Sequence, residues 1–259
     1  MYKRQVKRQS IAGNSNFHNN SVDEWMYSVS PNQQWLIASR LDGFCYLANL
    51  NEDRIQSTFN LSTSSKSIDW SSDNSKVAIL NQIGEITVLA VDGGGEEVKG
   101  EWTHFSLSQD GKKLGAVAAD YTLNVLSLES QQKADTLKME YPAKMLQWGK
   151  EGILYYSNVV GEFAEIDCKN GLKQSRSIQL ENSVFEVHPI PNENQLLLIS
   201  SDALSILDEE DFMLTCEHQI KNEIFEAHLL HDYSAVLYMT QDQKAVSYTH
   251  LTLPTKRIV

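Results

Sequence analysis

A turn followed by an apolar strand recurs six times along the chain, and this repeat constrains the fold more than any other feature. The turns begin at residues 30, 71, 108, 149, 190 and 230, so that successive copies are 41, 37, 41, 41 and 40 residues apart. Two clear copies are Ser30-Pro-Asn-Gln-Gln-Trp-Leu-Ile-Ala and Ser108-Gln-Asp-Gly-Lys-Lys-Leu-Gly-Ala. A regular period of this length is typical of solenoids, propellers and other repeat arrays.

Each copy continues into a second turn and a strand with alternating apolar residues. Examples are Asp42-Gly-Phe-Cys-Tyr-Leu-Ala and Gly84-Glu-Ile-Thr-Val-Leu-Ala-Val. Glycine and aspartate tolerate the positive φ of tight hairpin turns, and period-two alternation is typical of strands. A more polar segment follows, for example over residues 54–61 and 133–140. Four short antiparallel strands in about 40 residues predict an all-β protein made of β-propeller blades.

This unit resembles the WD40 repeat, whose blades carry F-S-P-D-G-x-x-L-A followed by D-G-x-I-x-V-W-D. The best matches are Phe105-Ser-Leu-Ser-Gln-Asp-Gly-Lys-Lys-Leu and Val29-Ser-Pro-Asn-Gln-Gln-Trp-Leu-Ile-Ala, and the resemblance covers residues 23–244. The chain departs from the family pattern, because no Gly-His pair precedes the blades and no Trp-Asp dipeptide closes them. Lactonase-like and outer-membrane-assembly propellers share this kind of turn, so the subfamily stays open.

The two ends of the chain differ from the repeats. Residues 1–5 (MYKRQ) and 246–259 (VSYTHLTLPTKRIV) resemble in-frame translations of an adapter used for sequencing libraries. We therefore expect an N-terminal extension or ring-closing strand in residues 6–21 and the propeller in residues 22–245. This segment holds about five and a half blades, and the resemblance to seven-bladed WD40 rings implies an incomplete ring. Alternation in residues 246–253 predicts a third strand in the sixth blade.

Composition narrows the classes of protein that the chain can be. Its 259 residues are 41% hydrophobic and 22% charged, which is ordinary for a globular protein. No uncharged apolar run approaches 18 residues, so no membrane span is expected. Cys45, Cys168 and Cys216 form no CxxC pair, which argues against a disulfide framework or a zinc knuckle. The net charge of −12 disfavours a broad nucleic-acid-binding surface, because such surfaces depend on clustered Lys and Arg.

The strand that leads into each repeated turn supplies the candidate site residues. Residues one and three positions before the turn are almost all apolar, and we expect them to lie between neighbouring blades. The alternate positions are on the opposite face of the strand, so they are expected to face the central channel. The polar channel-facing candidates are Asp69, His104, Glu186, His188, Glu226 and His228.

The most distinctive of these features is a repeated Phe-Glu-x-His. It occurs at residues 185–188 and again 40 residues later at residues 225–228. Within each strand the Glu and the His share a face, about 6–7 Å apart. Two such pairs could bind a metal or act as acid and base. Duplication of a blade with structural hydrogen bonds is the interpretation we favour, because buried polar groups in blades need partners. We therefore predict no catalytic residue, no metal and no cofactor.

Other polar features favour structural roles. Cys45 and Cys168 are interpreted as small core residues rather than nucleophiles. The acidic segment 208–211 is predicted to be a solvated loop at a blade tip, since no EF-hand spacing accompanies it.

Propellers host several classes of function, so the fold alone does not choose between them. We favour a non-catalytic scaffold that binds a protein or peptide through its blade-tip loops, with the cytoplasm as the default location. One alternative is a lactonase-like hydrolase with its site at the channel mouth. Another is an envelope-assembly or quinoprotein-type propeller. The segment Ala90-Val-Asp-Gly-Gly-Gly, followed by Trp102, is one imperfect copy of the quinoprotein motif.

Overall fold

A computed structural model of the chain describes residues 25–130, 133–190, 193–229, 235–242 and 244–249. Within these residues the secondary structure consists of strands and one 3-10 turn, η1 (Lys150–Gly152). The predicted N-terminal extension lies outside the described residues.

The strands form six antiparallel sheets, and each sheet is made of strands that are consecutive in the chain. The first sheet contains β1 (Trp25–Val29), β2 (Trp35–Arg40), β3 (Phe44–Asn49) and β4 (Arg54–Asn60). The second contains β5 (Ser65–Trp70), β6 (Lys76–Asn81), β7 (Ile86–Ala90) and β8 (Gly95–Val98). The third contains β9 (Trp102–Leu107), β10 (Lys113–Ala118), β11 (Thr122–Ser127) and β12 (Lys133–Lys138).

The second half of the chain repeats this order. The fourth sheet contains β13 (Ala143–Trp148), β14 (Ile153–Asn158), β15 (Glu162–Asp167) and β16 (Lys173–Gln179). The fifth contains β17 (Val184–Ile190), β18 (Gln195–Ser200), β19 (Ala203–Asp208) and β20 (Met213–Gln219). The sixth contains β21 (Ile224–Leu229), β22 (Val236–Thr240) and β23 (Ala245–Tyr248).

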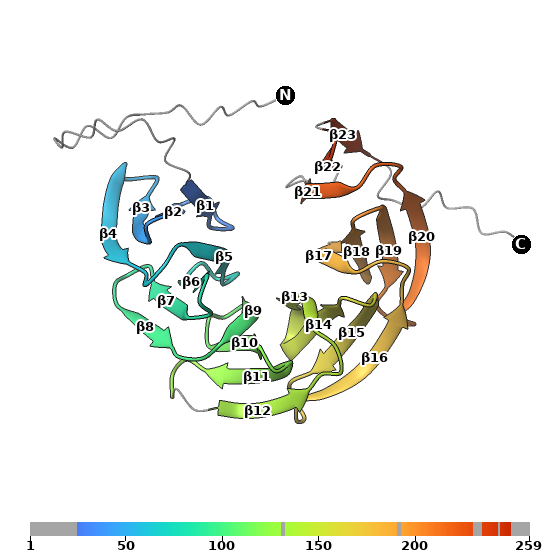
Figure 1. Cartoon of the computed structure of the whole chain (residues 1–259), viewed down its shortest axis with the longest axis horizontal. Coiled ribbons are helices and arrows are strands. Elements are labelled where there is room, and N and C mark those ends of the chain that lie inside the picture. The colour runs from blue at the N-terminus through green and yellow to red at the C-terminus, as the bar shows by residue number, and fades with distance from the viewer. Residues whose placement is uncertain (1–24, 131–132, 191–192, 230–234, 243, 250–259) are drawn as a thin grey trace, which may run out of the picture.

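The six sheets are arranged as blades in an arc, with the first strand of each blade innermost (Figure 1). The prediction of four-stranded antiparallel propeller blades is confirmed: the described residues form five four-stranded sheets and one three-stranded sheet. Strand β23 pairs with β22, as predicted for the start of the alternating C-terminal tail, and residues 250–253 lie outside the described residues.

The core of the molecule consists of five clusters of buried residues, one at each junction between successive blades. Between the third and fourth blades, for example, Leu123 packs with Trp148 and Tyr156. Burial of each such side chain contributes roughly 1.5–3 kcal/mol. The prediction that residues one and three positions before the turn lie between blades is confirmed for Trp70, Leu107 and Trp148.

The first blade departs from this rule. Tyr27 and Val29 of β1 are exposed, although their positions are apolar in the other blades. The first blade buries its other side against the second blade, where Ile37 packs with Val77. Within the described residues, no blade covers the side of β1 on which Tyr27 and Val29 lie. The prediction is therefore wrong for these two residues.

The two ends of the blades form two different faces of the arc. On one face, the turn between the second and third strands is joined to the linker between blades by a backbone hydrogen bond. The N–H of Gln82 donates to the carbonyl of Ser64 (3.0 Å), and the N–H of Ala119 donates to that of Glu101 (2.8 Å). We call this the linker face. The opposite face carries the other two turns of each blade. A backbone hydrogen bond also joins these turns: in the first blade the N–H of Leu50 donates to the carbonyl of Gln34 (2.8 Å).

Gly161 on the linker face occupies a position that tolerates no side chain. Its φ is +87°, and an added Cβ would lie 2.5 Å from the carbonyl oxygen of Leu180. We expect Gly161→Ala to lower the free energy of unfolding by about 1–3 kcal/mol, because strain and a steric clash coincide. Urea denaturation followed by tryptophan fluorescence measures this change.

The matched control is Gly171→Ala. Gly171 has a φ of +93°, but nothing lies within 4 Å of an added Cβ. This variant isolates the backbone strain from the clash with the linker. Equal losses in the two variants would contradict the role that we assign to the close approach at Gly161.

Candidate functional site

Five of the six inner strands, all except β1, have a bulge near the linker face. In β5 the residue pairs with β6 pass from Ser65 to Ser67, which leaves Lys66 without a partner in the register. The same interruption leaves out one residue in four further inner strands: Thr103, Lys144, Phe185 and Phe225. Bulges add one residue to a strand and redirect its side chains. Lys66 and Lys144 are both exposed at these positions.

Asp69 is held in a network that joins three blades. Its Oδ2 accepts a hydrogen bond from the N–H of Leu107 (2.8 Å) and one from the hydroxyl of Ser106 (3.0 Å). The Ser106 hydroxyl oxygen accepts the N–H of Trp148 (3.1 Å), and the Trp148 indole donates to the Ser106 carbonyl (2.9 Å). Burial raises the pKa of Asp69 to about 6, although the two hydrogen bonds oppose this shift. This network gives Asp69 a structural role between blades.

His104 lies between two lysines of neighbouring blades. The Lys66 ammonium donates to the backbone carbonyl of Thr103 (3.1 Å), next to His104. Nδ1 of the His104 ring lies 3.3 Å from the hydroxyl oxygen of Thr103. Burial and the positive charges of Lys66 and Lys144 lower the pKa of His104 to about 4. The ring is therefore neutral at pH 7.

Glu186 and His188 form a pair within one strand. Oε2 of Glu186 lies 3.1 Å from Nε2 of His188, and both side chains are half-buried in β17. Glu226 and His228 occupy the matching register positions in β21, opposite Met239 and Leu237 of β22. Their side chains lie outside the described residues, so the convergence of the two pairs stays a prediction.

The described residues contain no group of three or more metal-ligating side chains, and no helix among them is long and apolar enough to cross a membrane. Cys45 is buried and Cys168 is half-buried, as expected for core residues. Burial raises the pKa of the Cys168 thiol to about 12.

The acidic tip at residues 208–211 joins two blades. The Tyr155 hydroxyl donates to Oε1 of Glu209 (2.5 Å), and Arg176 donates to the Glu209 carbonyl (2.7 Å). The same guanidinium forms an ion pair with Glu165 (2.5 Å) and lies over the ring of Phe212 (4.8 Å). The prediction of a solvated loop is therefore wrong for Glu209, because its carboxylate accepts a hydrogen bond from Tyr155 of the preceding blade.

Each of the first four blades carries an exposed apolar side chain on its linker-face turn. The turns between the second and third strands carry Leu41 (61% exposed), Ile83 (55%) and Val159 (50%), with Tyr121 and Val160 also exposed. These turns belong to the first four blades. The sequence carries the signal, since an apolar residue stands beside each turn glycine or aspartate, but the repeat pattern alone does not show which turns share a face.

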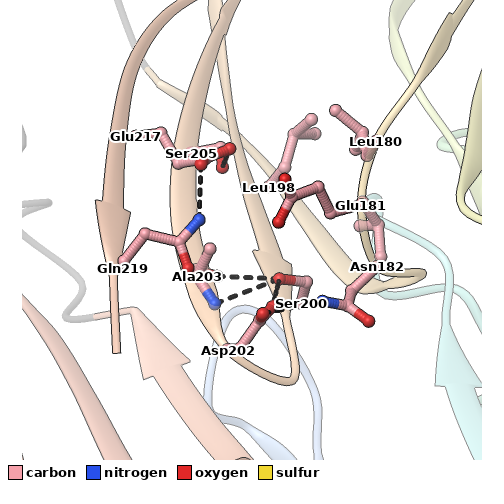
Figure 2. Close-up of a pocket in the computed structure, with 11 residues that line it drawn as sticks. Leu180, Glu181, Asn182, Leu198, Ser200, Asp202, Ala203, Ser205, Glu217 and Gln219 are labelled. Carbon is pink, nitrogen blue, oxygen red and sulfur yellow. Dashed lines mark hydrogen bonds between the residues drawn. The ribbon is translucent and has the colours of Figure 1, made fainter. Parts of the chain in front are cut away.

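The fifth blade presents a polar surface instead. A cavity between the linker and the β18–β19 turn is lined by Glu181, Asn182 and Asp202 among others (Figure 2). Asn182 donates to Oδ2 of Asp202 (2.7 Å), and Ser200 accepts the N–H of Ala203 (3.1 Å). Its volume of about 10 Å³ is room for one water molecule. A wider groove of about 350 Å³ lies beside β8 and β11, against Trp102 and Leu126.

Solved structures show which fold this geometry defines. A chain of the Mitotic Checkpoint Complex is similar, with a TM-score of 0.72 and 11% identity over 86% of this chain and 76% of that one. The C-terminal WD40 domain of Sif2 is also similar, with a TM-score of 0.73 and 11% identity over 90% of this chain and 69% of that one. The β-propeller domain of Cps50 (Swd1) from Myceliophteria thermophila has a TM-score of 0.72 and 11% identity over 89% of this chain and 84% of that one. The chain therefore has the WD40-type β-propeller fold.

The sequence itself gives no such match. No known family and no curated protein matches it. The resemblance to the WD40 repeat is thus confirmed by the fold, at a sequence identity of 11%.

Proposed function

We propose that the chain is a non-catalytic scaffold that binds a protein or peptide on its linker face. The observation that carries this proposal is the group of exposed apolar side chains on the turns of the first four blades, with Leu41, Ile83 and Val159 as its principal members. Exposed apolar side chains that recur on one face of a soluble protein are a feature of interaction sites. We call these three side chains the apolar tips.

The contrast between the faces supports the choice of surface. The turns after the inner strands, on the opposite face, contain mainly polar residues, such as Ser71-Ser-Asp-Asn-Ser and Ser108-Gln-Asp-Gly-Lys. Their hydroxyl and carboxylate groups are occupied within the turn: Asp73 accepts from Ser71 (2.6 Å) and Asp110 accepts from Ser108 (2.7 Å). The side chains of Leu41, Ile83 and Val159 are apolar and cannot form such hydrogen bonds.

Selection from a displayed library of random 12-residue peptides tests the proposal. We expect the protein to enrich binding peptides, and we expect the triple variant Leu41→Ser/Ile83→Ser/Val159→Ser to lose at least 10-fold in affinity for them, because apolar residues at the centre of an interface contribute most of its energy. Fluorescence anisotropy of labelled peptides measures the affinity. Each substitution is at the surface and is expected to change stability by less than about 0.5 kcal/mol.

The matched control is Leu50→Ser/Ile55→Ser/Met213→Ser. These three apolar side chains are also exposed, and they lie at or next to turns of the opposite face. The control is expected to bind the selected peptides as the unchanged protein does. Equal losses in the two triple variants, or no peptide that depends on the apolar tips, would refute the proposal.

A further inference from the structure

We propose that Lys66 and Lys144 bind a carboxylate side chain of the partner peptide at the centre of the linker face. This inference rests on the proposed function and names the chemistry of the partner: a peptide with an Asp or Glu that is flanked by apolar residues. The apolar residues contact the tips, and the acidic residue lies at the centre of the arc between the two lysines.

Both lysines lie on inner strands that contact β9. Each is the bulged residue of its inner strand, in the blade before and the blade after β9. Inner strands line the centre of the arc (Figure 1), and both lysines follow directly from linkers of the linker face. The Lys66 ammonium donates to the Thr103 carbonyl of β9 (3.1 Å), and β13, which carries Lys144, packs against β9. The positive charges of both lysines act on His104 of β9.

The charges of these lysines are not neutralised within the described part of the chain. Neither ammonium takes part in an ion pair there, whereas Lys112, Lys138 and Lys169 each have a carboxylate partner. His104 between them is neutral at pH 7, so it neither competes for an anion nor repels one. An anion placed here gains two positive partners, in a protein whose net charge is −12.

The surrounding linkers restrict where an acidic residue can bind. They carry the exposed carboxylates Glu101, Glu140, Glu181 and Glu223. A peptide carboxylate is repelled by these groups and attracted by the two lysines. Charge complementarity of this kind determines register and excludes incorrect partners more than it adds affinity. The occupant that fits is therefore an apolar peptide with a central acid, and a uniformly acidic peptide does not fit.

Composition of the selected peptides is the first measurement. We expect the peptides that depend on the apolar tips to be enriched in Asp or Glu beside aliphatic or aromatic residues, relative to the unselected library. Lys66→Gln/Lys144→Gln is expected to weaken their binding roughly 3- to 30-fold, because two exposed charge contacts are lost. Binding to the unchanged protein is also expected to weaken with added salt, and this dependence is reduced in the variant.

Two further variants make the result specific. Lys66→Arg/Lys144→Arg keeps both charges and should retain binding within about 3-fold, if charge rather than shape is recognised. Lys113→Gln/Lys173→Gln removes two exposed lysines that lie at the opposite face and form no ion pair with a described residue, so net charge changes equally. This control is expected to bind normally.

The outcomes separate this inference from the proposed function. Selected peptides that depend on the apolar tips but contain no excess of Asp or Glu would overturn the lysine site and leave the scaffold intact. The same conclusion follows if Lys66→Gln/Lys144→Gln and Lys113→Gln/Lys173→Gln bind equally. Failure to select any peptide that depends on the tips counts against both proposals.

Discussion

Phe163→Ala is expected to lower the free energy of unfolding by about 3–5 kcal/mol. Phe163 is completely buried in the cluster between the fourth and fifth blades. Its ring stacks with Tyr155 at 5.8 Å on one side and with Phe212 at 5.9 Å on the other. Removal of the ring leaves a cavity and deprives two aromatic neighbours of their contacts. One side chain thus supports the junction of two blades.

Urea denaturation followed by circular dichroism measures this loss. Phe163→Leu keeps most of the apolar volume and is expected to lose less than about 1.5 kcal/mol. Val160→Ala, at an exposed position of the preceding turn, serves as the surface control and should change stability by less than about 0.5 kcal/mol. A loss below 1 kcal/mol for Phe163→Ala would contradict the packing described here.

Asp69→Asn is expected to stabilise the protein at pH 7 by roughly 2–3 kcal/mol and to remove a pH dependence. Burial raises the pKa of Asp69 from 3.8 to about 6. Because the folded protein holds this proton more tightly than the unfolded chain, the stabilisation from Asp69 is complete below pH 4. It is lost as the pH rises through about 6. An asparagine carbonyl keeps the acceptor for Leu107 and Ser106 without the desolvation cost of a half-buried charge.

The measurement is the free energy of unfolding of both proteins at pH values from 4 to 8. The difference between them isolates Asp69 from the other carboxylates, and it should grow as the pH rises from 4 to 7. Asp69→Ala also removes the charge but leaves the N–H of Leu107 and the Ser106 hydroxyl without this acceptor. It should therefore be less stable than Asp69→Asn. A pH-independent difference would show that Asp69 titrates normally.

The fold follows from local signals in the sequence. Turns such as Ser30-Pro-Asn and Ser108-Gln-Asp-Gly recur at a nearly constant period, and their side chains hydrogen-bond within the turn itself. A turn of this kind forms wherever those few residues occur, so blade boundaries could be predicted without knowledge of tertiary contacts. The polar inner-strand positions of Asp69 and His104 followed from the same alignment.

The candidate site depends on bulges and on contacts between blades, which the alternation of apolar and polar residues does not predict. A bulge adds a residue without a strong composition signal, so Lys66 and Lys144 were not among the predicted site residues. The bulge positions of other blades hold Thr103 and Phe185, so no single residue type marks this position in the sequence. The bonding of Glu209 to Tyr155 crosses between blades over 54 residues of sequence. Such partners are determined by how blades stack, which no local pattern specifies.

The bulge in the inner strands separates the residues that hold the sheet together from the residues that are exposed on the linker face. Lys66 and Lys144 have no cross-strand partner, so their substitution alters no residue pair in the sheets. The neighbouring residues Ser65 and Ala143 are buried, and they keep their pairing with Asn81 and Asn158. At the proposed binding surface, each of these two residues can therefore be substituted without a change in the strand pairing of its blade.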